Sequence, residues 1–333
     1  MSEQNLRYAV IGGGSWATAL VKVLCSTQDT VHWYLRDARN IEFIKQHKCN
    51  QKYLKSVRLD TSKIVFHNNI NDAIKSADII VFCIPSAYFL EQIKPINVPL
   101  SDKYIVSAIK GLVSKDNLTI AEYFKAYFDL PYDRIIVLSG PTHSEEVAMD
   151  NLSYITFSSK YEEVAAMVAK GFETDYVKVI TGTDIYGVEF SAAMKNIYAI
   201  AVGICHSMRM GDNFIAVLTT GAFNEMKKFL NDTHPDKGRV TTTSAYLGDL
   251  LVTCYSQFSR NRTFGGMIGK GYSVISARME MPMVAEGYYA TRSIYEISKK
   301  YNMELPIVNA VYRILYEDSS PYMEMKMLAD QLL

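Results

Sequence analysis

Short apolar runs alternate with helical patterns through the first half of the 333-residue chain. The runs are rich in β-branched residues, which is typical of strands that are buried on both faces. Strands that alternate with helices predict a parallel sheet with helices on both faces. The predicted strands lie at residues 8–11, 30–35, 63–66, 78–84, 104–109, 134–138, 153–157 and 176–180.

From about residue 184 the strand pattern stops, and long helical patterns continue to the end of the chain. Residues 188–203 are apolar almost all round, with Lys195 and Asn196 near the middle. Such a helix is expected to be buried, so its charge needs an explanation. Without a Pro- or Ser-rich linker between the halves, we predict an α/β domain over residues 1–184 and an all-α domain over 185–333, packed over a shared cleft.

A glycine-rich turn follows the first predicted strand. Gly12 permits a tight turn, Gly14 lets the backbone approach a pyrophosphate, and Ala17 is small enough for close packing of helix on strand. The helix that starts at Ser15 and Trp16 would offer N–H groups and its positive dipole end to the phosphates. The pattern favours a Rossmann-type dinucleotide-binding domain over an ordinary structural turn.

The second predicted strand ends in Arg36 and Asp37. An acidic residue at this distance from the glycines commonly binds the ribose hydroxyls of NAD, whereas an arginine accommodates the 2'-phosphate of NADP. Arg36 could pair with that phosphate or lie flat against the adenine, and Asp37 could instead cap the next helix. The sequence therefore leaves the choice between NADPH and NADH open.

Composition narrows the possible classes of protein. Lys plus Arg and Asp plus Glu both total 35, so the formal net charge is zero and no nucleic-acid or acidic-membrane surface is indicated. The five cysteines are odd in number and widely spaced in apolar surroundings, which predicts reduced thiols rather than a disulfide frame or a metal site. We expect a cytoplasmic protein without an N-terminal leader, since the glycine turn begins at residue 12 and no apolar run approaches the ~20 residues of a membrane span.

Three places in the second half and one in the first could carry chemistry. Desolvation of Lys195 would lower its pKa toward the range useful for proton transfer, although its head could also reach water along an apolar stem. Asp249 could cap a helix or face Lys195. The run Ser259-Arg260-Asn261-Arg262 suits phosphate oxygens but could be a solvated basic loop, and Lys110 could be an ordinary surface lysine at a strand end.

Taken in order, these motifs resemble those of the bacterial-type NAD(P)-dependent glycerol-3-phosphate dehydrogenases. The likeness runs from about residue 7 to residue 317 and is most specific in AMKN, LGDL and SRNR, in that order and at those distances. The matching segments lie at 12–20, 35–37, 50–54, 84–86, 109–112, 138–148, 187–204, 211–213, 247–254, 259–265 and 284–287.

The resemblance implies the reversible reduction of dihydroxyacetone phosphate to sn-glycerol 3-phosphate, a phospholipid precursor, by a homodimer that uses NADPH or NADH. It implies that Lys195 protonates the nascent alkoxide and acts as base in the reverse direction. It places at the substrate Lys195, Lys110, Gly140, Thr142, Asp249, Ser259, Arg260 and Asn261. It places at the cofactor Gly12, Gly14, Ser15, Trp16, Arg36, Tyr53, Lys110, Ser144, Arg260, Val284 and Glu286.

Some residues depart from the family pattern, and two other functions remain open. Ala17 replaces the usual third glycine, and Thr142-His143-Ser144 replaces a smaller and more apolar trio, which puts side-chain contacts there in doubt. Another two-domain ketoacid or hydroxyacid reductase would share the glycine turn and a central lysine but would not require SRNR. A non-catalytic dinucleotide sensor would leave the ammonium of Lys195 unexplained.

Overall fold

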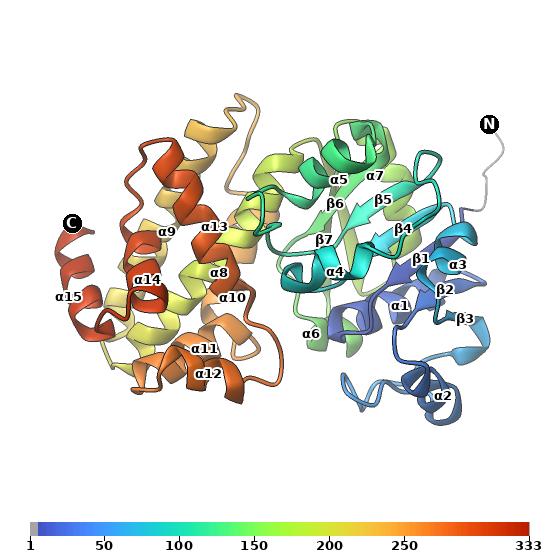
Figure 1. Cartoon of the computed structure of the whole chain (residues 1–333), viewed down its shortest axis with the longest axis horizontal. Coiled ribbons are helices and arrows are strands. Elements are labelled where there is room, and N and C mark those ends of the chain that lie inside the picture. The colour runs from blue at the N-terminus through green and yellow to red at the C-terminus, as the bar shows by residue number, and fades with distance from the viewer. Residues whose placement is uncertain (1–5, 333) are drawn as a thin grey trace. The chain divides into compact units, whose positions relative to one another are not determined.

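The structure, a computed structural model, describes residues 6–332 (Figure 1). These residues form two units. The first runs through Ile109 and resumes over Ile120–Ile185, and the second consists of Lys110–Thr119 and the chain from Tyr186 onward. The sequence boundaries instead place Lys110–Thr119 within the first domain, and its contacts with the helices explain the difference. Asn196 donates a hydrogen bond to the Lys110 carbonyl at one end of this segment, and Asn117 donates one to Glu296 toward the other.

The first unit contains a single eight-stranded sheet, and all eight predicted strands are confirmed. Its strand order is β3-β2-β1-β4-β5-β6-β7-β8. The bounds are β1 Tyr8–Ile11, β2 Val31–Tyr34, β3 Ile64–His67, β4 Ile79–Phe82, β5 Tyr104–Ser107, β6 Ile135–Ser139, β7 Ser153–Ser158 and β8 Val177–Gly182.

The sequence pattern predicts a parallel sheet, but the structure departs from this at one pair of strands. Strands β6 and β7 are antiparallel. The segment between them contains only the short helix α6 (Ser144–Ala148), and it joins the end of β6 to the start of β7 at the same end of the sheet. Strand β7 therefore begins where β6 finishes and runs back beside it. Apolar runs are alike in parallel and antiparallel strands that are buried on both faces, so strand direction was not encoded in the pattern.

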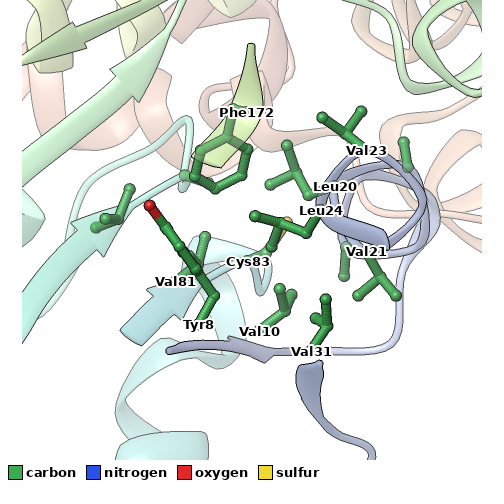
Figure 2. Packing of buried hydrophobic residues seen from close by; sticks show 14 of the residues in the cluster. Tyr8, Val10, Leu20, Val21, Val23, Leu24, Val31, Val81, Cys83 and Phe172 are labelled. Carbon is green, nitrogen blue, oxygen red and sulfur yellow. The ribbon is translucent and has the colours of Figure 1, made fainter. Parts of the chain in front are cut away.

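Helices cover both faces of this sheet. The helices of the first unit are α1 Ser15–Thr27, α2 Ala38–His47, α3 Ile70–Lys75, α4 Phe89–Ile93, α5 Ile120–Phe128, α6 and α7 Glu162–Ala169. On one face, Val10, Val31 and Val81 of the strands pack against Leu20 and Leu24 of α1 (Figure 2). On the other face the Phe124 ring of α5 lies 5.1 Å from Phe82 and 5.7 Å from Phe89, measured between centroids.

The second unit is helical throughout its longer segment, as predicted, apart from loops. Its helices are α8 Ile185–Ser207, α9 Asp212–Thr233, α10 Asp249–Tyr255, α11 Arg260–Gly269, α12 Val274–Glu280, α13 Glu286–Lys300, α14 Pro306–Tyr316 and α15 Pro321–Gln331. A π-helical turn, Ser244–Gly248, leads directly into α10. These helices run from yellow-green to red in Figure 1.

Helix α8 is the buried centre of this unit, as its all-round apolar pattern predicts. Contrary to the sequence expectation, α8 is long and apolar enough to cross a membrane by length and composition alone. Its most apolar 18-residue window is, however, buried throughout within the protein. Helices α11 and α13 pack on it main chain to main chain. A Cβ at Gly265 would lie 2.1 Å from the Ile200 carbonyl oxygen, and one at Gly287 would lie 2.5 Å from that of Asn196.

Candidate active site

The main-chain carbonyl groups of the glycine turn in the first unit accept hydrogen bonds from three side chains. The Trp33 indole donates to the Gly12 carbonyl at 2.7 Å, and the Asn50 amide donates to the Gly13 carbonyl at 3.1 Å. The Thr18 hydroxyl donates to the Gly14 carbonyl at 2.9 Å. With each carbonyl bound from the protein side, the turn is rigid, and rigid backbone suits the close approach of a pyrophosphate.

The residues at this turn fit a dinucleotide. Gly12 has a φ of 134°, and a Cβ there would lie 2.2 Å from the Cys83 carbonyl oxygen, so no other residue is accommodated. A Cβ at Gly14 would instead meet no atom within 4 Å, which leaves open space beside the turn. Gly14 is the N-cap of α1, and no acidic residue lies in the first turn of that helix to oppose a phosphate. Ser15 is buried and Trp16 half-buried at this helix start.

The roles of Trp33 and Asn50 were not found from the sequence. Asn50 is fully buried, and its amide also donates to the Thr18 hydroxyl at 2.8 Å. Its signal was only its place in the motif at 50–54, because its partners lie 37 and 32 residues away along the chain.

Replacing Asn50 with alanine is expected to weaken NADPH binding about tenfold, because it removes two hydrogen bonds that fix the turn and leaves buried groups unpaired. The change is measured as the Kd for NADPH by fluorescence titration. Asn71→Ala is the matched control, since the Asn71 amide binds the exposed Pro95 carbonyl elsewhere in the same unit. Equal NADPH affinity in Asn50→Ala and the wild type would contradict this role.

The other predicted residues of the first unit lie at its turns and helix starts. Arg36 is exposed, with its guanidinium 3.6 Å from Glu91. Asp37 caps α2 by accepting from the Arg39 N–H at 3.0 Å, which supports the capping alternative. Tyr53 is half-buried in the turn after α2.

The remaining predicted residues of this unit follow β6. Gly140 has a φ of 121°, as a tight turn after that strand requires. The buried Thr142 donates its main-chain N–H to the Gly140 carbonyl at 2.8 Å. Ser144 starts α6 and donates its hydroxyl to Glu145 at 3.0 Å. The Thr142 hydroxyl donates to the same Gly140 carbonyl at 3.3 Å, so the hydroxyls of Thr142 and Ser144 both contact the protein locally.

The second unit brings together two lysines on one carboxylate. The Lys195 ammonium, in the middle of α8, donates a hydrogen bond to Oδ1 of Asp249. The Lys110 ammonium lies 3.7 Å from Oδ2 of the same carboxylate. Lys195 is 3 % exposed and Asp249 1 % exposed, so the alternative of a lysine that reaches water along its stem is excluded. Of the two roles considered for Asp249, the structure supports the one in which it faces Lys195.

Burial and the second lysine set the charge state of Lys195. Burial is the largest cause and lowers the pKa of Lys195 from 10.5 to about 7, the Asp249 carboxylate opposes that shift, and the Lys110 ammonium adds to it. Burial raises the pKa of the neighbouring Cys254 thiol to about 12, so this thiol is neutral at physiological pH. Lys195 can therefore both donate and accept a proton near neutrality.

The SRNR run begins α11 and is not a solvated loop. Ser259 is buried and caps the helix by accepting from the Arg262 N–H at 3.3 Å. Arg260 is half-buried in the first turn. The Asn261 amide is buried and donates to Oδ1 of Asn196 at 2.9 Å.

The side-chain oxygen Oδ1 of Asn261 accepts from the Gly287 N–H at 2.9 Å, in the first turn of α13. Val284 and Glu286 are half-buried where that helix begins. Asn196, which sequence reasoning noted only as a polar residue in an apolar helix, thus connects the predicted elements of this unit. The predicted substrate residues Gly140 and Thr142 lie in the first unit, while the predicted cofactor residues Lys110, Arg260, Val284 and Glu286 lie in the second. Each predicted set is thus divided between the units, and the shared cleft stays a prediction.

The cysteines form no disulfides among the described residues. All five cysteines are free thiols, and four of them are buried. Within residues 6–332, no group of three or more His, Cys, Asp and Glu side chains could hold a metal ion.

Comparison with known proteins decides the family. The model for the NAD-dependent glycerol-3-phosphate dehydrogenase N-terminus matches residues 7–166, and the one for the C-terminus matches residues 184–326. The chain belongs to this family. It is 35 % identical over 313 residues to the glycerol-3-phosphate dehydrogenase [NAD(P)+] of Staphylococcus carnosus, which covers 93 % of this chain and 94 % of that one.

Solved structures agree with the family and with the fold. The glycerol-3-phosphate dehydrogenase of Coxiella burnetii matches with a TM-score of 0.89 at 27 % identity, over 97 % of this chain and 98 % of that one. A D-mandelate dehydrogenase in complex with NADH matches with a TM-score of 0.59 at 14 % identity, over 94 % and 98 % of the two chains, and shows the fold alone. The predicted fold class, the NAD(P)-dependent oxidoreductase class and the nicotinamide cofactor are confirmed.

Proposed function

We propose that the chain interconverts dihydroxyacetone phosphate and sn-glycerol 3-phosphate, with Lys195 as the general acid and base. The observation that carries this proposal is the Asp249 carboxylate between the buried Lys195 ammonium and Lys110, in a member of the glycerol-3-phosphate dehydrogenase family. Nothing in a non-catalytic sensor requires two ammonium groups to share one buried carboxylate.

The proton chemistry follows from the environment of Lys195. When bound, the reduced nicotinamide supplies the hydride that converts the ketone carbon of the substrate into an alcohol carbon. Negative charge then develops on the ketone oxygen, and the Lys195 ammonium stabilises it and donates a proton to it. In the reverse direction neutral Lys195 accepts the hydroxyl proton. Because burial brings the pKa of Lys195 to about 7, both forms are populated near neutral pH.

The remaining predicted residues hold the ligands. Lys110 supplies a second positive charge beside the reacting oxygen, and Asp249 fixes the Lys195 ammonium. Arg260, with its planar guanidinium, would bind the substrate phosphate, with Ser259 and Asn261 fixing the start of its helix. Gly140 and Thr142 are proposed for the substrate. For the cofactor we propose Gly12, Gly14, Ser15, Trp16, Arg36, Tyr53, Lys110, Ser144, Arg260, Val284 and Glu286.

The test of this function is turnover by the purified chain. NADPH oxidation is followed at 340 nm with dihydroxyacetone phosphate, and with ketopantoate and a 2-ketoacid as competing substrates. We expect turnover with the phosphorylated ketone alone, because the planar guanidinium of Arg260 suits the oxygens of a phosphate group, which neither competing substrate carries. NADPH binding without turnover of dihydroxyacetone phosphate would overturn the proposal, and turnover of a ketoacid would support the rival reductase.

Replacing Arg36 with alanine is expected to lower kcat/KM with NADPH about tenfold or more and to leave kcat/KM with NADH nearly unchanged. Arg36 follows the end of β2, where a 2'-phosphate would lie, and its guanidinium is exposed. Asp37 instead caps α2. The measurement is the ratio of rates with the two cofactors in wild type and variant. A loss of equal size with both cofactors would place Arg36 on the adenine instead.

We also propose that the protein is a cytoplasmic homodimer whose product supplies phospholipid synthesis. Five free thiols support a reducing compartment. The dimer and the metabolic role rest on membership of the family. Light scattering of the purified protein measures the assembly directly, and a monomeric mass would exclude the dimer.

A further inference from the structure

Lys110 lies at the point where the chain passes from the first unit to the second. Its side chain is only about one-fifth exposed, and its ammonium lies 3.7 Å from the Asp249 carboxylate. A lysine side chain has four rotatable bonds, so the position of its ammonium depends on how firmly its main chain is held. The group that holds it therefore bears on the geometry of the site.

Asn196 provides that hold. Its side-chain amide donates to the Lys110 carbonyl at 3.0 Å and to the Ala192 carbonyl, one turn back on α8, at 3.1 Å. Both N–H groups of the amide are therefore used, and both bind main chain. Since no N–H remains for a ligand, the contacts indicate a structural link between Lys110 and the helix that carries Lys195.

A second asparagine fixes the orientation of this amide. The Asn261 amide donates to Oδ1 of Asn196 at 2.9 Å, and the Asn261 oxygen accepts from the Gly287 N–H at 2.9 Å. Gly287 also packs directly on the Asn196 carbonyl, where any Cβ would lie 2.5 Å from that oxygen. The hydrogen bonds run without a break from the Lys110 carbonyl to the first turn of α13.

We propose that Asn196 is a positioning residue that ties the Lys110 main chain to α8 and so fixes the two ammonium groups on opposite oxygens of Asp249. This inference rests on the proposed function of Lys195 and Lys110. It gives Asn196 a role through Lys110 and not through contact with the substrate. It also explains why Lys110–Thr119 belongs to the helical unit although the chain on both sides belongs to the sheet.

The proposal has a signature in the pH profile that a purely structural role lacks. The titratable groups that shift the pKa of Lys195 are Asp249 and Lys110, and the neighbouring Cys254 is a neutral thiol at the pH of the assay. The Lys110 ammonium lowers the pKa of Lys195. If Asn196 no longer holds Lys110, that influence weakens and the pKa of Lys195 rises.

The experiment compares Asn196→Ala, Lys110→Met and the double variant with the wild type in NADPH-dependent reduction of dihydroxyacetone phosphate. We expect Asn196→Ala to lower kcat about 10- to 100-fold, as misplacement of a reacting group does, and to move the pH profile of kcat upward as Lys110→Met does. In the double variant, the second substitution is expected to lower kcat by less than about a further twofold. It is also expected to move the pH profile no further than either single variant does.

A matched control removes a different bond at the same place. Thr291→Val removes the buried hydrogen bond from the Thr291 hydroxyl to the Gly287 carbonyl, in the first two turns of α13. It leaves both asparagines in place. It is expected to keep kcat and the pH profile within about twofold of wild type. Asn196→Ser, which is too short to reach the Lys110 carbonyl, repeats the test with a polar residue if the alanine variant does not fold.

Three results separate the possibilities. If the losses of kcat in the two single variants multiplied in the double variant, and the pH profile did not move, the positioning role would be overturned. A raised KM for dihydroxyacetone phosphate with unchanged kcat would make Asn196 a substrate ligand and would also overturn it. Absence of turnover in the wild type would instead refute the proposed function, so failure of the one is distinguishable from failure of the other.

Discussion

Replacing Lys195 with alanine is expected to lower kcat for the reduction of dihydroxyacetone phosphate by about 10²- to 10⁴-fold, the range typical of a lost general acid. Lys195 is 3 % exposed, and its ammonium is directed to Asp249 by α8, so water cannot readily take its place. Lys110 cannot replace it either, because its ammonium is held near the other carboxylate oxygen. The measurement is steady-state kcat at pH 7 with saturating NADPH.

The same variant is expected to keep its affinity for NADPH within about threefold, because the glycine turn and its anchors lie in the other unit. Lys228→Ala is the matched control, a lysine of the same unit whose ammonium binds the exposed Glu304 carbonyl. It is expected to retain wild-type kcat. If Lys195→Ala kept more than a tenth of the wild-type kcat while remaining folded, Lys195 would not be the general acid.

The fold could be predicted from the sequence because its strands are short apolar runs separated by turns. Each of the eight strands forms where such a run lies, since two layers of helices bury both faces of the sheet. The direction of β7 could not be predicted, because it depends on the path of the residues between β6 and β7 and not on the composition of either strand.

Lys195 could be predicted because a charge in the middle of an all-round apolar helix is visible in the sequence. The sequence offered Asp249 as a possible partner but could not decide between that role and a helix cap, because Asp249 lies 54 residues further along and also has the sequence context of a cap. The family resemblance pointed to Asp249 without supplying that contact.

Asn50 and Asn196 act on main-chain carbonyls 37 and 86 residues away, and a carbonyl group leaves no trace in the sequence. Positioning residues of this kind are found only when the fold brings the chain segments together.

Replacing Asp249 with asparagine is expected to move the pH profile of reduction downward, opposite to the shift expected for Lys110→Met. The carboxylate raises the pKa of Lys195 and Lys110 lowers it, so removing the carboxylate takes that pKa below about 7 and removing Lys110 takes it above. Reduction requires the protonated lysine, and oxidation requires the neutral one. In Asp249→Asn, reduction therefore declines, and oxidation of glycerol 3-phosphate rises, at a lower pH than in wild type.

The same substitution is expected to lower the free energy of unfolding by about 3–5 kcal/mol at pH 6, because a buried ammonium loses its counter-charge. The folded state of the wild type binds fewer protons than the unfolded state between pH about 7 and 10.5, so Lys195 contributes stability that rises with pH through that window. In the variant the window extends to lower pH, and the loss is smaller at pH 9, where Lys195 is neutral in the fold. Urea unfolding at the two pH values measures this difference. An equal loss at both, together with an unmoved pH profile, would mean that Asp249 does not set the charge state of Lys195.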